Sequence, residues 1–313
     1  MLYLTDAEVA LILNPQSAAE AIEGAFRSLA DGSSAVQQRV RTITPAGKLS
    51  MVGGVMVSAD RAGAKVYPTT KDGRFGFVVL LFALSSGEPL AVMEGSTLTE
   101  IRTAATSVVA ARYLAPPNPE VLVVFGAGRQ AVAHALAFAD EFDLAEIRLV
   151  NRRDAADVER RIKQSTGVPT IQMTGDALEG ADLVITATRS TEALFDGRAL
   201  PRRCHITAVG ATTPESRELD AKTIARSDWI VVESISQAQV EAGDLLLAER
   251  EGTSVWERVV ELADLVSGQT TRPGGPEQIT LYKSLGIGLE DVAVADAVYR
   301  AAMAQSVGRF LGE

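Results

Sequence analysis

A motif typical of dinucleotide binding lies near the middle of the chain. Directly after the apolar run VLVVF (121–125) comes a glycine-rich turn, Gly126-Ala127-Gly128-Arg129-Gln130-Ala131, which opens a predicted helix that extends to about Glu141. In such a turn the first glycine permits a tight bend, the second lets the backbone approach a pyrophosphate, and the small third residue allows close helix packing. The helix N-terminus offers free N–H groups to phosphates. The spacing therefore predicts that residues 126–130 bind a dinucleotide.

The end of the next predicted strand distinguishes between the two nicotinamide cofactors. An NAD site usually places an acidic residue there, which holds the ribose 2′-hydroxyl. Here the strand EIRLV (146–150) is followed by Asn151-Arg152-Arg153, and no acid occurs before Asp154. Two guanidiniums can hold a 2′-phosphate through charge-assisted hydrogen bonds, although two such arginines can also form a merely solvated surface. We therefore predict NADPH as the cofactor, with NADH as the alternative.

Basic residues in the first third of the chain are the candidate substrate ligands. Lys65 is one of six lysines in the whole chain and lies in a strand-like run, AGAKVYP (62–68). Arg102 lies one turn into a predicted helix, whereas Arg39 and Arg41 alternate on a predicted strand and should share one face. A lysine in a strand is often exposed, and a helix arginine is usually on the surface. Spacing alone leaves open whether these charges are functional or only solvated.

The elements that must position these residues change in character along the chain. Residues 1–34 have a helical pattern, with Thr5 and Ser17 as predicted N-caps. A helix capped by Thr99 is predicted at 99–115, and the proline cluster at 116–119 ends it. Between these helical segments, apolar runs predict strands at 40–44, 50–58, 62–68, 77–84 and 89–93.

Beyond the proline cluster, strand and helix patterns alternate. A final helix is predicted at about 290–310. Short β-branched runs predict strands at 121–125, 146–150, 181–188, 205–209 and 229–234. This alternation is typical of a parallel sheet covered by crossover helices. The predicted fold class is α/β, with a Rossmann-type doubly wound parallel sheet inserted after a mixed α+β domain.

Composition argues against several classes of function. The chain has 30 Lys and Arg residues against 40 Asp and Glu, a formal charge of −10, which disfavours nucleic-acid and anionic-membrane binding. Cys204 is the only cysteine, and with only His134 and His205 the chain offers little material for a zinc site. The sequence shows no secretory-leader pattern and no apolar run long enough to cross a bilayer. We expect a cytoplasmic protein whose partner is a small molecule.

Four sequence blocks resemble the ornithine cyclodeaminase/mu-crystallin family. They occur in the family's order and read RTAA (102–105), GAGRQA (126–131), REL (217–219) and YKSLGIGLED (282–291). The resemblance runs from about residue 36 almost to the C-terminus and is greatest to the mu-crystallin-like ketimine reductase branch. It implies a homodimer in which residues 1–116, joined by 292–313, bind substrate and dimerise, while residues 117–291 bind NAD(P).

The same resemblance implies roles for individual residues. The family's carboxylate-binding arginine matches Arg41, its lysine matches Lys65, and its RTAA arginine matches Arg102; Lys65 and Arg102 are the predicted catalytic residues. The implied reaction is NADPH-dependent reduction of a small α-imino acid, such as pyrroline-2-carboxylate or piperideine-2-carboxylate, with Lys65 as the candidate proton donor. The residues that should line the nicotinamide side are Thr186, Thr188, Val209 and Ser284.

Two departures from the family's patterns bear on the reaction. Ornithine cyclodeaminases have a catalytic aspartate where this chain has Thr212, a predicted substrate-binding residue. A hydroxyl with no neighbouring base cannot replace a carboxylate, so cyclodeamination is disfavoured. The run Phe75-Gly76-Phe77-Val78 replaces polar residues that mu-crystallin-like proteins carry, which indicates a more apolar or differently shaped substrate side chain.

Two further alternatives stay open at this stage. An enzyme of the alanine dehydrogenase type, which reductively aminates a 2-oxo acid, needs the same carboxylate-binding set, so the rate dependence on ammonium separates it from an imine reductase. A non-catalytic, NADPH-dependent small-ligand-binding protein is the other alternative. It has no need of Arg41, Lys65 and Arg102 together.

Overall fold

The computed structural model describes residues 1–271 and 277–312, which form two compact units. The first unit consists of Met1–Thr106 and Gly286–Glu313, and the second of Ser107–Leu285. The chain therefore leaves the first unit once and returns to it at its C-terminal end. The predicted domain boundaries, after residues 116 and 291, lie close to this division and stay a prediction.

The first unit is built on a seven-stranded sheet with the order β15-β1-β6-β5-β4-β3-β2. Its neighbouring strands are antiparallel, except that β1 runs parallel to β6. The five strands predicted between residues 40 and 93 are confirmed, whereas β1 and β15 are too short to give a pattern. The strands are β1 (Leu2–Leu4), β2 (Ser34–Thr44), β3 (Gly47–Met56), β4 (Arg61–Thr70), β5 (Val78–Ala83), β6 (Pro89–Glu94) and β15 (Arg309–Phe310).

Four helices belong wholly or partly to this unit: α1 (Asp6–Ile12), α2 (Pro15–Ala30), α3 (Ser96–Leu114) and α10 (Gly288–Gln305). Thr5 caps α1 in a reciprocal pair with Glu8, as predicted. The other two predicted caps are wrong. Asn14 caps α2 and leaves Ser17 inside the helix. Likewise, α3 begins before Thr99 because the Asp6 carboxylate accepts the N–H of Thr97 at 2.7 Å.

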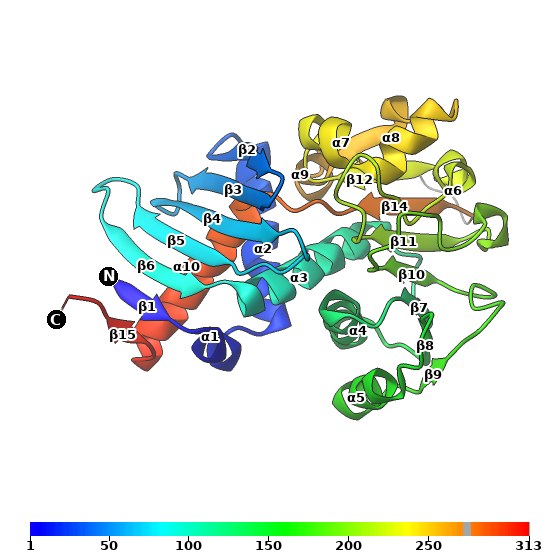
Figure 1. Cartoon of the computed structure of the whole chain (residues 1–313), viewed down its shortest axis with the longest axis horizontal. Coiled ribbons are helices and arrows are strands. Elements are labelled where there is room, and N and C mark those ends of the chain that lie inside the picture. Colours follow the sequence, from blue (N-terminus) through cyan, green and yellow to red (C-terminus); the bar gives the residue numbers. More distant parts are fainter. Residues whose placement is uncertain (272–276, 313) are drawn as a thin grey trace. The chain divides into compact units, whose positions relative to one another are not determined.

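Helix α10 lies along one face of the sheet, as its orange-red ribbon shows in Figure 1. Eleven of its 18 residues are buried, so both polar and apolar members of its first three turns are removed from water. At its start a Cβ on Gly288 would collide with the backbone of Gly53, so glycine lets the helix contact β3 directly. We call the sheet face toward α10 the inner face; it carries Arg61, Gly63 and Lys65 of β4, which contact Asp296, Val292 and Asp291.

The opposite, outer face of this sheet is apolar. Val40, Met51, Val66 and Val78 follow one another in register across β2, β3, β4 and β5. Among them Val40 is 50% exposed and Val78 is 43% exposed, and Leu49 beside them is 50% exposed. Apolar surface gathered on one face of a sheet is unusual for a surface that stays in water.

The second unit contains an eight-stranded sheet with the order β13-β12-β14-β11-β10-β7-β8-β9, and all of its neighbours are parallel. The order β9-β8-β7-β10-β11 is that of a Rossmann fold read as 3-2-1-4-5, so the predicted doubly wound sheet is confirmed. The strands are β7 (Val121–Phe125), β8 (Glu146–Val150), β9 (Thr170–Gln172), β10 (Leu183–Thr186), β11 (Cys204–Ala208), β12 (Trp229–Val232), β13 (Val259–Glu261) and β14 (Ile279–Lys283).

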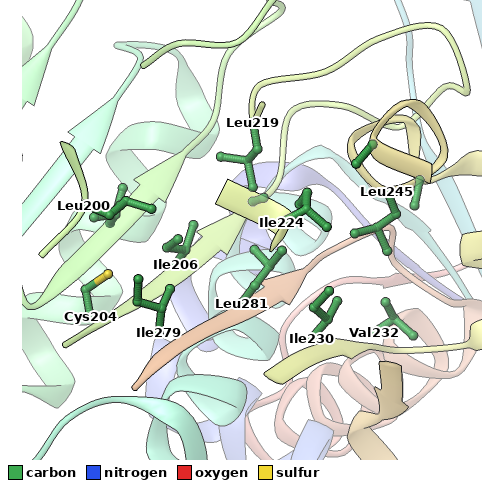
Figure 2. Packing of buried hydrophobic residues seen from close by; sticks show 14 of the residues in the cluster. Leu200, Cys204, Ile206, Leu219, Ile224, Ile230, Val232, Leu245, Ile279 and Leu281 are labelled. Atoms are coloured by element: carbon green, nitrogen blue, oxygen red, sulfur yellow. The ribbon is translucent and has the colours of Figure 1, made fainter. Parts of the chain in front are cut away.

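Both faces of this sheet are covered. Helices α4 and α5 pack on one face, and an apolar core that includes Ile224 of α6 and Leu245 of α8 covers the other (Figure 2). Within the described residues, no helix is long and apolar enough to cross a membrane. The helices are α4 (Arg129–Glu141), α5 (Ala156–Thr166), α6 (Ala221–Arg226), α7 (Ile235–Glu241), α8 (Gly243–Arg250) and α9 (Leu262–Val266), with 3-10 turns at Gly197–Ala199 and Trp256–Arg258.

Candidate active site

Lys65 lies buried on the inner face of the first unit, with only 3% of its surface exposed. Its Nζ donates to Asp291 Oδ1 at 2.8 Å and to the Thr99 hydroxyl at 3.4 Å. Spacing alone leaves open whether this lysine faces solvent, and it is buried because α10 covers this part of β4. A buried ammonium with one anionic partner is a group whose proton can be used in chemistry.

Arg102 of α3 reaches the same carboxylate. Its Nε donates to Asp291 Oδ1 at 3.0 Å, and its Nη1 donates to Glu290 Oε2 at 2.5 Å. Arg102 is 6% exposed, and both carboxylates are buried more deeply still. The structure thus brings together Lys65 and Arg102, two of the three cations predicted to bind substrate, around two acids at the start of α10.

The charges of this cluster alter one another's pKa values. Burial and the neighbouring Arg102 lower the pKa of Lys65 to about 8, against the opposing effect of Asp291. Burial by itself raises the pKa of Asp291, but Arg102 and Lys65 outweigh it, and the net pKa is lowered. At neutral pH the cluster therefore holds a carboxylate and an ammonium that gives up its proton more readily than an exposed lysine does.

Arg41 lies on the same inner face. It is paired in register with Ser50, which in turn pairs with Tyr67, two residues from Lys65 on β4. Arg39 lies in the stretch between Gln37 and Val40 where the register of β2 shifts. Its Nη2 donates to the carbonyl oxygen of Gly286 at 2.8 Å. Arg39 is therefore a fourth cation near the cluster, and it also lowers the pKa of Lys65.

Aromatic rings border the Lys65 ammonium. Its Nζ lies 5.2 Å from the ring centroid of Phe77 and 5.9 Å from that of Tyr67. The two rings are 5.0 Å apart, and Phe75 continues the row. Ring faces attract cations, so these aromatics favour positive charge at this place.

In the second unit, the glycine-rich turn has the backbone that a dinucleotide requires. Gly126 has φ +116°, and a Cβ there would lie 2.6 Å from the carbonyl oxygen of Ala187, so only glycine fits between β7 and the end of β10. No side chain caps the N-terminus of α4, which begins at Arg129. Gly128 is exposed with open space where a Cβ would be. A helix N-terminus beside an open glycine fits a pyrophosphate.

Gly128→Ala is a direct test of that fit. The methyl group would meet no protein atom within 4 Å, and the extended backbone of Gly128 suits alanine, so we expect thermal unfolding to change little. A dinucleotide approaching this backbone would meet the methyl group at a cost of about 1–3 kcal/mol, which weakens NADPH binding roughly tenfold to a hundredfold. Titration of NADPH fluorescence checks this, with Gly24→Ala, another open position, as the control. Unchanged affinity in Gly128→Ala would contradict the predicted cofactor site.

A buried carboxylate, Glu218, ties together the ends of β10 and β11. Its Oε1 accepts from the N–H and hydroxyl of Thr188 at 2.6 and 2.7 Å. Its Oε2 accepts from the Thr186 hydroxyl at 2.9 Å and from the N–H of Gly210 at 2.6 Å. Burial raises the pKa of Glu218, and the nearby Lys283 ammonium opposes that effect. Glu218 thus fixes the two threonines that are predicted to line the nicotinamide side.

A second buried ion pair supports Glu218 in turn. Asp244 Oδ1 accepts the backbone N–H groups of Glu218 and Leu219, and its Oδ2 lies 3.2 Å from Lys283 Nζ. Residue-type reasoning assigns no role to Glu218, Asp244 or Lys283. Glu218 and Lys283 lie in the family blocks REL and YKSLGIGLED, and these two residues meet Asp244 here although all three are far apart in the sequence.

The other predicted cofactor residues follow the ends of β8, β11 and β14. Asn151, Arg152 and Arg153 are exposed after β8, and the Asn151 amide donates to the carbonyl oxygen of Arg153 at 3.0 Å. Val209 is half-buried, and its N–H donates to the carbonyl oxygen of Thr186 at the end of β10. Ser284 is buried, and its N–H donates to the carbonyl oxygen of Ala208 at the end of β11. Of the other predicted site residues, Ala127 lies in the turn before α4 and Gln130 in the first turn of that helix. Thr212, the predicted substrate ligand, lies in the loop after β11.

The chain is similar to known proteins in sequence and in fold. The family model described as "Ornithine cyclodeaminase/mu-crystallin family" matches residues 1–306. The chain belongs to this family. Ketimine reductase mu-crystallin of Mus musculus is 36% identical over 290 residues, which are 89% of this chain and 90% of that protein. The resemblance inferred from the four sequence blocks is thereby confirmed.

Two solved structures of the ornithine cyclodeaminase/mu-crystallin type are also similar to the chain. A probable ornithine cyclodeaminase from Bordetella pertussis Tohama I has a TM-score of 0.95 and 42% identity, covering 99% of this chain and 100% of its own. Delta(1)-pyrroline-2-carboxylate reductase of Thermococcus litoralis, solved with NADH and L-proline, has a TM-score of 0.94 and 26% identity, covering 99% and 100%.

Proposed function

We propose that the chain is an NAD(P)H-dependent reductase that converts a small α-imino acid, such as pyrroline-2-carboxylate or piperideine-2-carboxylate, into the amino acid. The observation that carries this proposal is the buried set of Lys65, Arg102 and Asp291. It combines cations for a carboxylate with an ammonium of lowered pKa for the imine nitrogen. The ketimine reductase mu-crystallin of Mus musculus and the Thermococcus litoralis reductase solved with NADH and L-proline support the same reaction type.

The proposed mechanism assigns each unit one half of the reaction. Reduction of an imine adds a hydride to carbon and a proton to nitrogen; a bound reduced nicotinamide supplies the hydride. Arg41 and Arg102 bind the carboxylate and orient the imine carbon, and Lys65 donates the proton to the imine nitrogen. In the second unit the turn at 126–130, with Thr186, Thr188, Val209 and Ser284, holds the cofactor. Thr212 contributes a hydroxyl to the substrate.

The proposed imine reduction is tested by monitoring the oxidation of NADPH through its absorbance. The two cyclic imino acids are compared with pyruvate plus ammonium, and NADH is run in parallel. Rapid oxidation with a cyclic imine and no requirement for ammonium is the expected result. Activity only with pyruvate plus ammonium would instead identify an enzyme of the alanine dehydrogenase type. Tight binding of these acids with no turnover would favour a binding protein.

For the cofactor we propose NADPH over NADH, on the basis of the exposed Arg152 and Arg153 after β8 and the lack of an acid before Asp154. Hydrogen bonds to a charged group contribute about 1.5–3 kcal/mol each. The variant Arg152→Ala/Arg153→Ala should therefore lower the ratio of kcat/KM for NADPH to that for NADH by at least about tenfold.

The matched control for this variant is Arg160→Ala/Arg161→Ala, two exposed arginines on α5 that should leave the ratio unchanged. The Thermococcus litoralis reductase was solved with NADH, so the ratio has to be measured directly. A preference that stays the same after Arg152 and Arg153 are removed would overturn the assignment.

We propose further that the chain is a homodimer located in the cytoplasm. Support for the dimer comes from the apolar outer face of the first unit, where Val40, Leu49 and Val78 are exposed. Pairing two copies of this face would remove these side chains from water. The mass in solution, measured by light scattering, decides between one copy and two, and Val40→Asp/Val78→Asp should shift a dimer to the monomer.

A further inference from the structure

Asp291 contacts both predicted catalytic residues, Lys65 and Arg102, although the sequence analysis assigns it no role of its own. It lies in the first turn of α10, 226 residues from Lys65 in the sequence, and its side chain is only 1% exposed. A single oxygen, Oδ1, accepts from both Lys65 Nζ and Arg102 Nε. This oxygen therefore fixes the position of one predicted catalytic side chain relative to the other.

The second oxygen of Asp291 has no hydrogen-bond partner among the described residues. Burying an ionised carboxylate is costly, and leaving one of its oxygens unsatisfied adds to that cost. The positive charges of Arg102 and Lys65 offset this cost, and they lower the pKa of Asp291 although burial raises it. What the arrangement provides is a negative charge placed directly against the Lys65 ammonium.

Other charged or titratable groups surround Lys65. Arg102 of α3 and Arg39 of β2 disfavour the protonated lysine, and Arg41 lies on the same sheet face. Tyr67 of β4 presents its ring, and Glu290 of α10 pairs with Arg102. In this surrounding Asp291 is the acid that contacts the ammonium itself.

We propose that Asp291 is a positioning residue that holds Lys65 in its charged form and aims its N–H groups for proton donation. The inference rests on the proposed function only in that Lys65 is the proton donor. Without the Asp291 charge, burial together with Arg102 and Arg39 would make Lys65 lose its proton at lower pH. The enzyme would then lose its proton donor at a pH where the unaltered protein still has it.

Asp291→Asn tests this with little change of shape. The amide oxygen can take the place of Oδ1 and accept from Lys65 and Arg102, while the amide nitrogen occupies the place of Oδ2, where it displaces no donor. The charge is removed, and the amide adds two N–H donors at the place of Oδ2. An opposite charge at this distance shifts a pKa by about 1–3 units, so the pKa of Lys65 should fall by about that amount.

The first readout does not depend on turnover. The protein is labelled with ¹³C at the lysine ε carbons, and with six lysines in the chain the spectrum is simple. Lys65→Met identifies the Lys65 signal by its loss. Titration of the labelled protein then gives the pKa of Lys65 directly, and we expect it to move downward in Asp291→Asn.

The second readout is the pH profile of kcat with a cyclic imino acid. Asp291→Asn should move the alkaline decline of kcat to lower pH by about 1–3 units, while the affinity for NADPH stays the same. The control is Asp296→Asn, on the same helix, which loses ion pairs to Arg61 and Arg300 but does not contact Lys65. Its profile should match that of the unaltered protein.

The outcomes separate this inference from the proposed function. A Lys65 pKa that does not change in Asp291→Asn, or that falls equally in Asp296→Asn, overturns the role of Asp291. If the unaltered protein reduces no imine, the proposed function fails, and the titration of Lys65 still decides whether Asp291 controls its charge.

Discussion

Replacing Lys65 with methionine is expected to lower kcat for imine reduction by about 10²- to 10⁴-fold, the range that general acid catalysis contributes. Methionine fills a similar volume but has no proton to donate, and it leaves Asp291 paired with Arg102. The affinity for NADPH should stay within about twofold, a difference of only about 0.4 kcal/mol. The predicted cofactor residues all belong to the second unit, whereas Lys65 belongs to the first. Steady-state kinetics and NADPH fluorescence titration measure the two effects separately.

The pH dependence of the unaltered protein should agree with this role. The pKa of Lys65 is about 8, so kcat should be constant below that pH and decline as Lys65 loses its proton above it. Lys71→Met, an exposed lysine in the turn after β4, is the control and should behave like the unaltered protein. Equal losses of turnover and of NADPH affinity in Lys65→Met would contradict the assignment of Lys65 as proton donor.

Arg102→Met should destabilise the protein by about 3–5 kcal/mol, the usual cost of removing one partner of a buried ion pair. Arg102 neutralises Glu290 and Asp291, both of which are buried at the start of α10. The variant loses the guanidinium that these two carboxylates share. Urea unfolding at pH 8 measures the loss, and the KM for the imino acid should rise as well, because a carboxylate ligand is removed.

The destabilisation by Arg102→Met should become smaller as the pH falls. Arg102 lowers the pKa of Asp291, so without it that carboxyl is protonated at higher pH, and protonation removes the uncompensated charge. Unfolding measured at pH 5 and at pH 8 should show the larger loss at pH 8. Arg27→Met removes an exposed partner of Glu23 in the same unit and should cost no more than about 1 kcal/mol. If both variants lose equal stability, the cluster around Arg102 does not act as a buried charge network.

Local sequence patterns predict a structural element correctly where that element depends on residues close together in the sequence. The turn at Gly126 could be placed because a strand, two glycines and a helix follow one another directly, and Thr5 could be placed as a cap because Glu8 is three residues away. Thr99 was misplaced because the residue that caps the start of α3, Asp6, comes from a different part of the chain. A cap supplied from 91 residues away leaves no local pattern.

The charge cluster around Lys65 likewise depends on residues that are far apart in the sequence and leave no local pattern. Types and spacing left open whether Lys65 and Arg102 are functional, and only the family resemblance assigned them a role. Their burial depends on α10, and Asp291 is 226 residues from Lys65 in the sequence. Glu218 is similar, because its four donors come from Thr186, Thr188 and Gly210, and no spacing rule connects them. Such partners become visible only when the sheet order is known.

The place of α10 in the first unit has a consequence for biosynthesis. The sheet of Met1–Thr106 cannot bury its inner face until Gly288–Gln305 has been made, and Ser107–Leu285 is translated in between. At about 5–20 residues per second, that intervening segment takes on the order of 10–40 s to emerge. During this time Lys65 has no counter-ion from α10, and the apolar strands beside it have no cover. The second unit is continuous in sequence and is complete first, so the unit that leaves the ribosome first is the last to be finished.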